Sequence, residues 1–201
     1  PDAYGPMGCN AATRLADDFE DGVFDEHLWD STFSDPGTSY AEMNGDLVLT
    51  LAPNSASTFV GYKSSVAMDF REQRVVAAIS QTPATNANMG FRIESDNASD
   101  AVVVSLEGGT LQARQTVGGS FNVLTTIPFS IGTHRFWAFS EHAGTLSWEW
   151  SQDGTTFTPF YSAPAPIDLS FMYVQMFAGT ANAVGAPGTA RFASFNAGVT
   201  P

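Results

Sequence analysis

The sequence predicts an all-β protein built as a sandwich of two antiparallel sheets. Short runs in which apolar and polar residues alternate recur along nearly the whole chain, and alternation with period two is typical of half-buried strands. Gly, Asn and Pro separate these runs, as expected for turns and strand ends. No window of about a dozen residues carries an apolar stripe at helical spacing without Gly or Pro.

Alternation predicts the strands in chain order. They cover residues 46–51, 59–63, 74–80, 89–94, 101–106, 110–117, 121–127, 135–140, 146–150, 170–177 and 190–195, with a further strand from Phe157 onward. Many short strands at even spacing, with turn signals between them, are typical of a β-sandwich.

The segment 133–160 gives the clearest local signals. Gly144-Thr145 and Asp153-Gly154 separate three strand patterns, and Asp-Gly between apolar runs is a strong hairpin signal because both residues tolerate positive φ. Leu146, Trp148 and Trp150 alternate with polar residues, so they share one face of a strand. We expect that face to be buried in the core rather than exposed for stacking on sugars.

Composition limits the possible partners. The 201 residues include 21 acidic and 8 basic side chains, with a formal net charge of −13. Such a chain would be repelled by nucleic-acid backbones and anionic membranes, so we expect neither as a partner. No run of about 18 apolar residues occurs, and membrane insertion is not expected. The low charged fraction of 14% is typical of extracellular β proteins, so we expect a secreted or cell-surface location.

The chain is expected to contain one domain. Residues 1–16 are rich in Pro, Gly and Asn and read as an N-terminal tail or linker, whereas 17–201 continue without a linker-like interruption. Cys9, the one cysteine, lies in that tail and cannot form an intramolecular disulfide. The chain starts at Pro1, which suggests a trimmed chain or a mature product without its signal peptide.

Three segments carry a resemblance to a known group. They are Asp17-Asp18-Phe19-Glu20-Asp21 with Leu28-Trp29, then Gly90-Phe91-Arg92-Ile93 with 101–106, then the late meander 144–157. Together the chain resembles the concanavalin A-like lectin/glucanase superfamily, and the late meander is similar to its laminin-G-like branch. The resemblance implies a jelly-roll β-sandwich of two curved antiparallel sheets, an extracellular location and often sugar binding, although a fold does not determine function.

An acidic opening is the candidate metal site. Seven carboxylates lie between Asp17 and Asp30 without a Lys or Arg, and calcium prefers six to eight oxygen ligands. The spacing is not that of an EF-hand loop. A solvated acidic edge is one interpretation, and a structural calcium bound near Asp18 and Glu20 is the other. Relatives of the resembling group often carry such an ion between a terminal strand and a neighbouring loop.

The polar strand faces provide the candidate ligand site. In the resembling group the concave sheet often holds the ligand, and planar donors beside aromatic rings can read sugar hydroxyls. The predicted ligand-binding residues are Arg92, Glu94, Arg114, Glu149, Tyr173 and Gln175. An ordinary solvated outer face is the alternative for each of them.

Catalytic motifs are weak. Glycoside hydrolysis needs two carboxyl groups about 5 to 10 Å apart, and glucanases of the resembling fold place them on one strand as E-x-D-x-x-E or E-x-D-x-E. Here Glu94-Ser95-Asp96 begins such a pattern, but the residues up to Asp100 read as a turn. The three histidines lack metal-ligand spacing, and no G-x-S-x-G motif is present.

The sequence therefore favours a non-catalytic, extracellular carbohydrate-binding or adhesion-type module that recognises a glycan or cell-surface polysaccharide. Two alternatives remain open. One is a polysaccharide-active glycoside hydrolase, which two carboxylates in one groove would favour. The other is a structural or protein-interaction module of a cell-surface protein, which a featureless concave face would favour.

Overall fold

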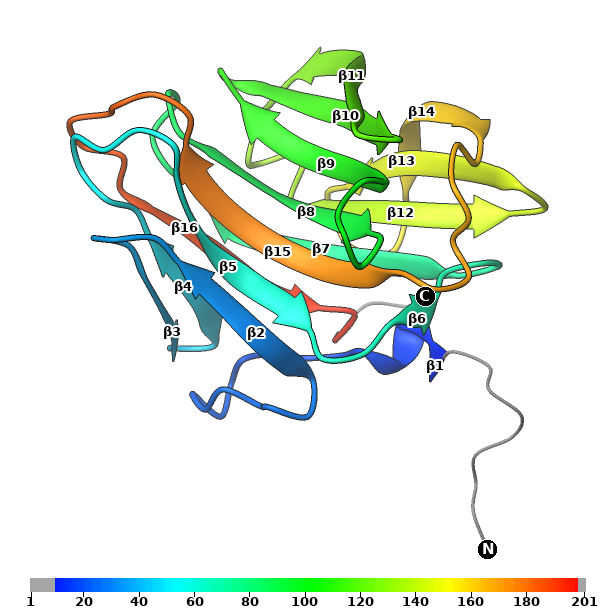
Figure 1. Cartoon of the computed structure of the whole chain (residues 1–201), viewed down its shortest axis with the longest axis horizontal. Coiled ribbons are helices and arrows are strands. Elements are labelled where there is room, and N and C mark those ends of the chain that lie inside the picture. The colour runs from blue at the N-terminus through cyan, green and yellow to red at the C-terminus, as the bar shows by residue number, and fades with distance from the viewer. Residues whose placement is uncertain (1–9, 199–201) are drawn as a thin grey trace, which may run out of the picture.

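The computed structural model describes residues 10–198, apart from the side chains of residues 30–32. It confirms the predicted all-β sandwich, with two seven-stranded antiparallel sheets (Figure 1). The front sheet contains, in spatial order, β11 (Ser120–Pro128), β10 (Thr110–Val117), β9 (Ala101–Glu107), β8 (Asn88–Glu94), β15 (Tyr173–Thr180), β5 (Thr58–Ser64) and β2 (Trp29–Ser34). The back sheet contains β14 (Thr158–Pro164), β13 (Thr145–Ser151), β12 (Phe136–His142), β7 (Arg74–Gln81), β16 (Thr189–Phe195), β4 (Asp46–Thr50) and β3 (Ser39–Met43).

Two strands of the large sheets were not predicted from alternation, and both lie at sheet edges. β2 and β3 are the last strands of the front and back sheets. Their sequences, WDSTFS and SYAEM, lack a regular apolar face, because an edge strand covers less of the core than a central one. The edge strand β14 contains Pro159 and Pro164, which fit there because an edge strand can spare backbone N–H donors.

The predicted hairpins form where glycine permits positive φ. β12 and β13 are joined by Ala143 and Gly144, with φ of 49° and 79°. Gly118 and Gly119 join β10 to β11 with φ of 53° and 78°. The Asp153-Gly154 signal lies in the longer connection between β13 and β14, where Asp153 Oδ1 accepts backbone N–H groups from Thr155 and Thr156 at 2.9 Å each.

The core fills the space between the two sheets. Trp148 is fully buried, and Trp150 packs against the core from the same face, as predicted. The Trp148 indole N–H donates to the backbone carbonyl of Val103 at 3.0 Å. This hydrogen bond links β13 of the back sheet to β9 of the front sheet.

The packed unit begins earlier than the predicted boundary at residue 17. β1 (Asn10–Ala11) pairs in parallel with β6 (Met68–Asp69), and a 3₁₀ turn spans Ala12–Arg14. Ala12 and Leu15 are fully buried in the core, so residues 10–16 are part of the sandwich rather than a tail. Cys9 lies outside the described residues. Over residues 10–198 no helix is long and apolar enough to cross a membrane.

Candidate functional site

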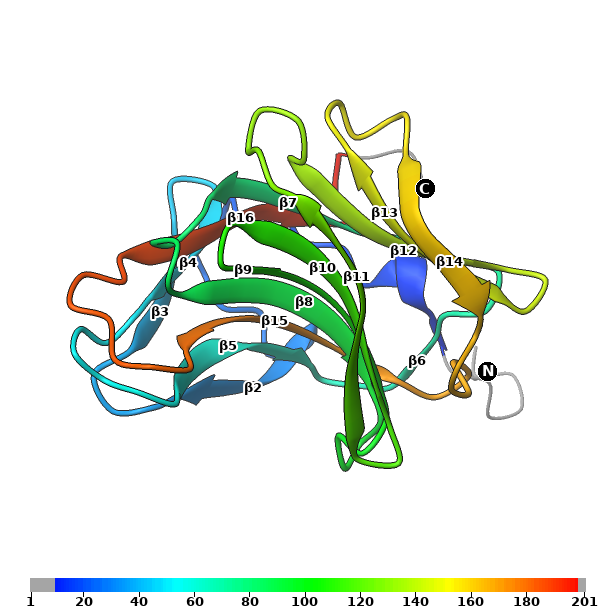
Figure 2. The ribbon, with the colours of Figure 1, turned by 90° about the horizontal axis from the view of Figure 1, so that it is seen from above.

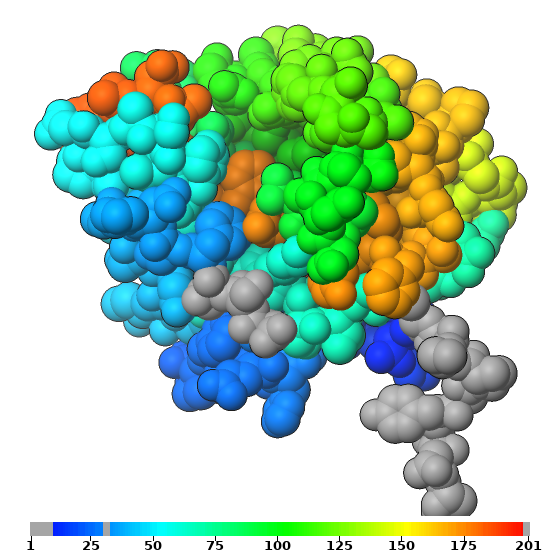
Figure 3. All heavy atoms as spheres, viewed as in Figure 1, coloured from blue at the N-terminus to red at the C-terminus, as the bar shows by residue number. Residues whose placement is uncertain are grey.

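The outer face of the front sheet is concave. Seen from above, β8 to β11 bend away from the back sheet (Figure 2). The space-filling view shows a hollow between the green strands β9 to β11 and the cyan and blue segments, with β15 in orange at its floor (Figure 3). Side chains alternate across each strand, so residues next to the buried core positions face this groove.

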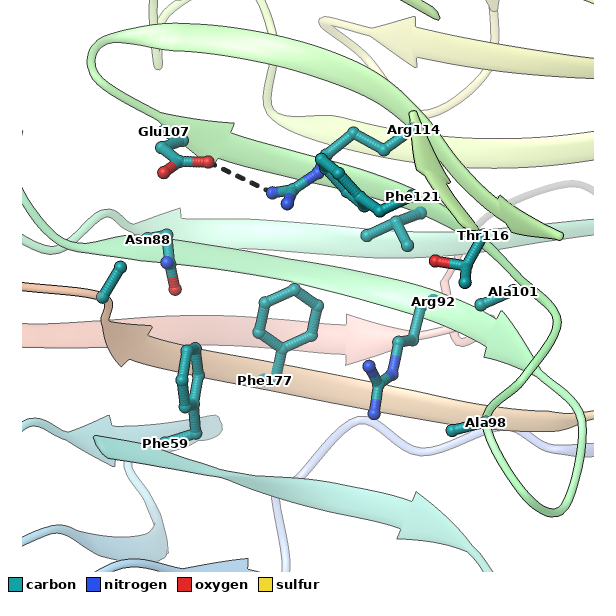
Figure 4. A pocket seen from close by; sticks show the side chains of 12 residues that line it. Phe59, Asn88, Arg92, Ala98, Ala101, Glu107, Arg114, Thr116, Phe121 and Phe177 are labelled. Carbon is teal, nitrogen blue, oxygen red and sulfur yellow. Dashed lines mark hydrogen bonds and ion pairs between the residues drawn. The ribbon is translucent and has the colours of Figure 1, made fainter. Parts of the chain in front are cut away.

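Two cavities lie along the groove, each of about 280 Å³. The first is shown in Figure 4 and is lined by Phe59, Asn88, Arg92, Ala98, Ala101, Val103, Glu107, Arg114, Thr116, Phe121, Phe177 and Ala181. The second is lined by Phe33, Phe59, Arg92, Gln175 and Phe177. Phe59, Arg92 and Phe177 line both, so the two cavities form one continuous site.

Three phenylalanine rings form the floor of the groove, because strand glycines beneath them leave room for the rings. A Cβ on Gly90 would lie 3.0 Å from Phe177 Cζ. Gly61 accommodates the Phe33 ring and Gly179 the Phe59 ring in the same way. Strand glycines often mark such a close approach. The rings therefore rest against the sheet and offer an aromatic platform beside polar donors.

Arg92 is the central cation of the groove. Its Nε lies 2.8 Å from Glu94 Oε2, and its guanidinium lies 5.9 Å from the centre of the Phe177 ring. Nε is buried, and among the described residues it makes the ion pair with Glu94 but no hydrogen bond of good geometry. In Figure 4 the guanidinium points into the cavity from β8. Burial lowers the pKa of Arg92, and the neighbouring Glu94 opposes that shift.

Arg114 forms the second cationic position, on β10. Its Nη1 donates to Ser105 Oγ and to Glu107 Oε2, both at 3.2 Å. Its guanidinium lies 4.4 Å from the centre of the Phe121 ring. Nε is buried and lacks a hydrogen-bond partner within the described part of the chain. Burial lowers the pKa of Arg114, with Glu107 acting in the opposite direction.

Glu94, Tyr173 and Gln175 complete the groove-facing group of predicted residues. Tyr173 pairs with Glu94, and Gln175 pairs with Arg92 across β15 and β8. Glu94 is buried and also lies 3.3 Å from Lys63 Nζ, which sits 4.7 Å from the centre of the Tyr173 ring. Five of the six predicted ligand-binding residues thus share one face, although their binding role stays a prediction.

Glu149 is the exception, because it lies on the back sheet. It extends from β13, where its carboxylate accepts from Arg74 Nε at 3.0 Å and from Ser140 Oγ at 2.9 Å. Trp148 and Trp150 on the same strand point toward the core, so Glu149 points to the outer surface of the back sheet. The strand pattern gave its face correctly but could not show to which sheet the strand belongs.

Carboxyl groups in the groove are few. Glu94 and Glu107 both face it, but the registers of β8 and β9 place them six residues apart along the strands, which is about 20 Å. Asp96 follows Glu94 by two residues, so their Cα atoms are at most about 7 Å apart. Asp96 is exposed at the start of the β8–β9 turn. Glu94 and Asp96 are therefore close enough in the chain for their carboxyl groups to lie within the separation that glycoside hydrolysis requires.

The acidic opening does not assemble a metal-binding group in the described residues. Asp18 Oδ1 accepts the backbone N–H of Glu20 at 3.2 Å, and both residues are exposed. Across residues 10–198 no three His, Cys, Asp or Glu side chains are grouped to hold a metal ion. Calcium at Asp18 and Glu20 remains a prediction, which thermal unfolding with and without a chelator would test.

The analysis of alternation missed the groove phenylalanines and Lys63. A signal existed for Phe177, since it continues the alternation of Tyr173 and Gln175. Phe33 lies on an edge strand that was not predicted, and Lys63 is the second-last residue of a strand whose position in the sheet was unknown.

Comparison with solved structures shows a concanavalin A-like jelly roll. A β-glucanase from Bacillus licheniformis aligns with a TM-score of 0.69 at 12% identity, covering 90% of this chain and 95% of that one. An endo-β-1,3-glucanase from Pyrococcus furiosus gives 0.67 at 11%, covering 90% and 91%. LamA of Z. galactanivorans, in complex with laminaritriose and laminaritetraose, gives 0.63 at 11%, covering 90% and 95%. No protein-family model matches the chain, and no curated protein matches it in sequence.

These likenesses correct the functional expectation. The sequence favoured a non-catalytic glycan-binding or adhesion-type module, whereas the similar structures are largely glycan-cleaving β-glucanases. These structures favour the polysaccharide-active alternative over the non-catalytic module. At such low identity the likeness establishes the fold, and the reaction has to be argued from this chain's own groove.

Proposed function

We propose that this protein is an extracellular glycoside hydrolase that binds a polysaccharide chain along the concave face of the front sheet. The observation that carries the proposal is the platform of Phe33, Phe59 and Phe177 beside Arg92 and Gln175, all in one cavity. Aromatic rings provide apolar contact for sugar rings, while guanidinium and amide groups provide directional hydrogen bonds to hydroxyls. The fold shared with endo-acting glucanases supports this assignment.

Glu94 and Asp96 are the proposed carboxyl pair. In glycoside hydrolysis one carboxyl group protonates the glycosidic oxygen as the bond to the anomeric carbon breaks. The other either activates a water molecule or bonds to that carbon until water releases it. Lys63 and Arg92 hold Glu94 from two sides, which fixes the direction of its carboxylate. The products would be two shorter chains, one with a new reducing end.

Measurement of new reducing ends tests the proposal. The purified protein would be incubated with laminarin, mixed-linkage β-glucan and polygalacturonate, and the oligosaccharides separated by chromatography. We expect the wild type to cleave at least one polymer. The initial rate should fall by about 100-fold or more in Glu94→Gln and in Asp96→Asn. Glu26→Gln, at an exposed position that lines neither cavity, should retain the wild-type rate.

Because Glu94 is buried between two cations, its variant also needs a folding check by circular dichroism. Asp96→Asn lies at an exposed turn and should fold normally. If the wild type releases no reducing ends from any polymer, or if both variants keep the full rate, the proposed hydrolysis through this pair is wrong.

A further inference from the structure

Positive charge gathers in the groove of an otherwise acidic protein. Three of the eight basic residues, Lys63, Arg92 and Arg114, lie on the concave face, whereas the whole chain carries a net charge of −13. Of the 21 acidic residues, only Glu94 and Glu107 extend into the groove from the described side chains of its strands. The groove thus has the opposite charge balance to the rest of the molecule.

The three cations form one row across the sheet. Arg114 pairs with Val103, and Val103 pairs with Arg92. Gln175 then pairs with Arg92 on one side and with Lys63 on the other. Successive cations are therefore separated by two strand spacings, which is about 10 Å. This is about the length of a disaccharide unit in an extended glycan that crosses the strands.

The carboxylates on this face compensate the cations incompletely. Glu94 is shared between Lys63 and Arg92, and Glu107 is half-exposed beside Arg114. Both guanidinium groups are largely buried, and burial lowers their pKa values because the charged form loses water. A bound anion would restore the lost solvation with charge-assisted hydrogen bonds, and the planar guanidinium suits the two oxygens of a carboxylate or sulfate.

We infer that the substrate is an acidic polysaccharide whose carboxylate or sulfate groups bind the row formed by Arg114, Arg92 and Lys63. This inference rests on the proposed function for the cleavage of that polymer, but the binding can be tested separately. The Gln175 amide lies within the row, and it makes no hydrogen bond with the residues that the structure describes. It would bind a sugar hydroxyl between two anionic groups. The phenylalanine platform would support the ring faces.

The acidic character of the whole protein does not prevent such binding. At physiological ionic strength the screening length is about 8 Å, so a polymer inside the groove interacts mainly with the charges that line it. The remaining surface is acidic and repels an anionic polymer as it approaches. This repulsion weakens as salt is added.

Isothermal titration calorimetry with three polymers tests the inference. Polygalacturonate supplies carboxylates, carrageenan supplies sulfates, and laminarin is neutral. We expect at least one acidic polymer to bind about tenfold more tightly than laminarin, and Arg92→Gln and Arg114→Gln each to weaken that binding about tenfold. Arg14→Gln, an exposed arginine on the 3₁₀ turn, is the matched control and should bind like the wild type.

The outcomes separate the inference from the proposed function. Tighter binding of laminarin, absence of binding to both acidic polymers, or equal loss in Arg14→Gln would overturn the acidic substrate. Cleavage of laminarin without binding of acidic polymers would overturn it while leaving the hydrolase standing. Binding of an acidic polymer that depends on Arg92 and Arg114, without release of reducing ends, would support the inference and refute the hydrolase. Preference between polygalacturonate and carrageenan identifies the anionic group.

Discussion

Glu42 is a buried acid at the seam between the two sheets. It extends from β3 and is only 8% exposed. Its Oε1 accepts the Tyr62 hydroxyl at 3.2 Å, and its Oε2 has no hydrogen-bond partner in the described residues. Burial raises the pKa of Glu42 from its ordinary value of 4.5 to about 7, and repulsion from Asp17, Asp21 and Asp25 adds to the shift.

This raised pKa makes stability depend on pH. Folding favours the protonated form, so the contribution of protonated Glu42 is complete below pH 4.5 and is lost as the pH rises through about 7. The loss amounts to roughly 3 kcal/mol. Glu42→Gln keeps a neutral hydrogen-bonding side chain at every pH. We expect the variant to be more stable than the wild type at pH 8 and similar to it at pH 5.

Urea unfolding of both proteins at the two pH values measures this difference. Each comparison uses wild type and variant in the same buffer, so the titration of other groups cancels. A stability difference that stays constant between pH 5 and pH 8 would show that Glu42 does not titrate in this range.

The face of the sheet on which a side chain lies was largely predictable from the sequence. The residues beside it on the neighbouring strands were not. Alternation gave the outward faces of Arg92, Tyr173 and Gln175 because a strand has a period of two. The row of Arg114, Arg92 and Lys63 depends on pairings between segments up to 112 residues apart, as for Gln175 and Lys63. Such register arises from packing of the whole sheet, and no local pattern specifies it.

At the scale of elements, β11 is an unusual edge strand. It covers Ser120–Pro128 and pairs with β10 on one side. Its sequence, SFNVLTTIP, contains no charged residue, and Phe121 and Val123 are both about half exposed. Edge strands are usually protected by charge, because their free backbone groups can pair with another chain. Pro128 protects only the final position of β11.

We therefore expect weak self-association through β11 at high protein concentration. Val123→Lys places a charge at the exposed middle of the strand and should reduce the apparent mass of the associated species. Sedimentation velocity over a concentration series measures this. Thr125→Val, which leaves the strand uncharged, serves as the control and should associate at least as strongly as the wild type. Equal behaviour of Val123→Lys and the wild type would exclude association through this edge.

The same reasoning explains which elements the sequence could predict. Central strands such as β7, β8 and β9 bury at least one face completely, so their alternation or continuous apolar character is strong. β2, β3 and the short β1 and β6 carry too few regularly spaced apolar residues to form a pattern. Residues 10–16 looked like a tail because their buried side chains, Ala12 and Leu15, are too few to form a pattern.

At the scale of the whole molecule, the sandwich separates a supporting sheet from the sheet that carries the proposed binding groove. The back sheet and the core hold the front sheet in a curved shape, and the curvature creates the groove (Figure 2). Composition and periodicity could predict the two-layer architecture, since both describe the chain as a whole. They could not distinguish a module that only holds a glycan from one that cleaves it, because that difference depends on a few carboxyl groups in one place.

The hydrogen bond from Trp148 to Val103 has a practical consequence for this architecture. The indole belongs to the back sheet, while the Val103 side chain lines the groove cavity. A polymer that shifts β9 when it binds in the groove would change the surroundings of this indole. Its ultraviolet emission would then report occupancy of the groove without any attached dye, and Trp148→Phe would silence the signal while leaving the other three tryptophans as a constant background.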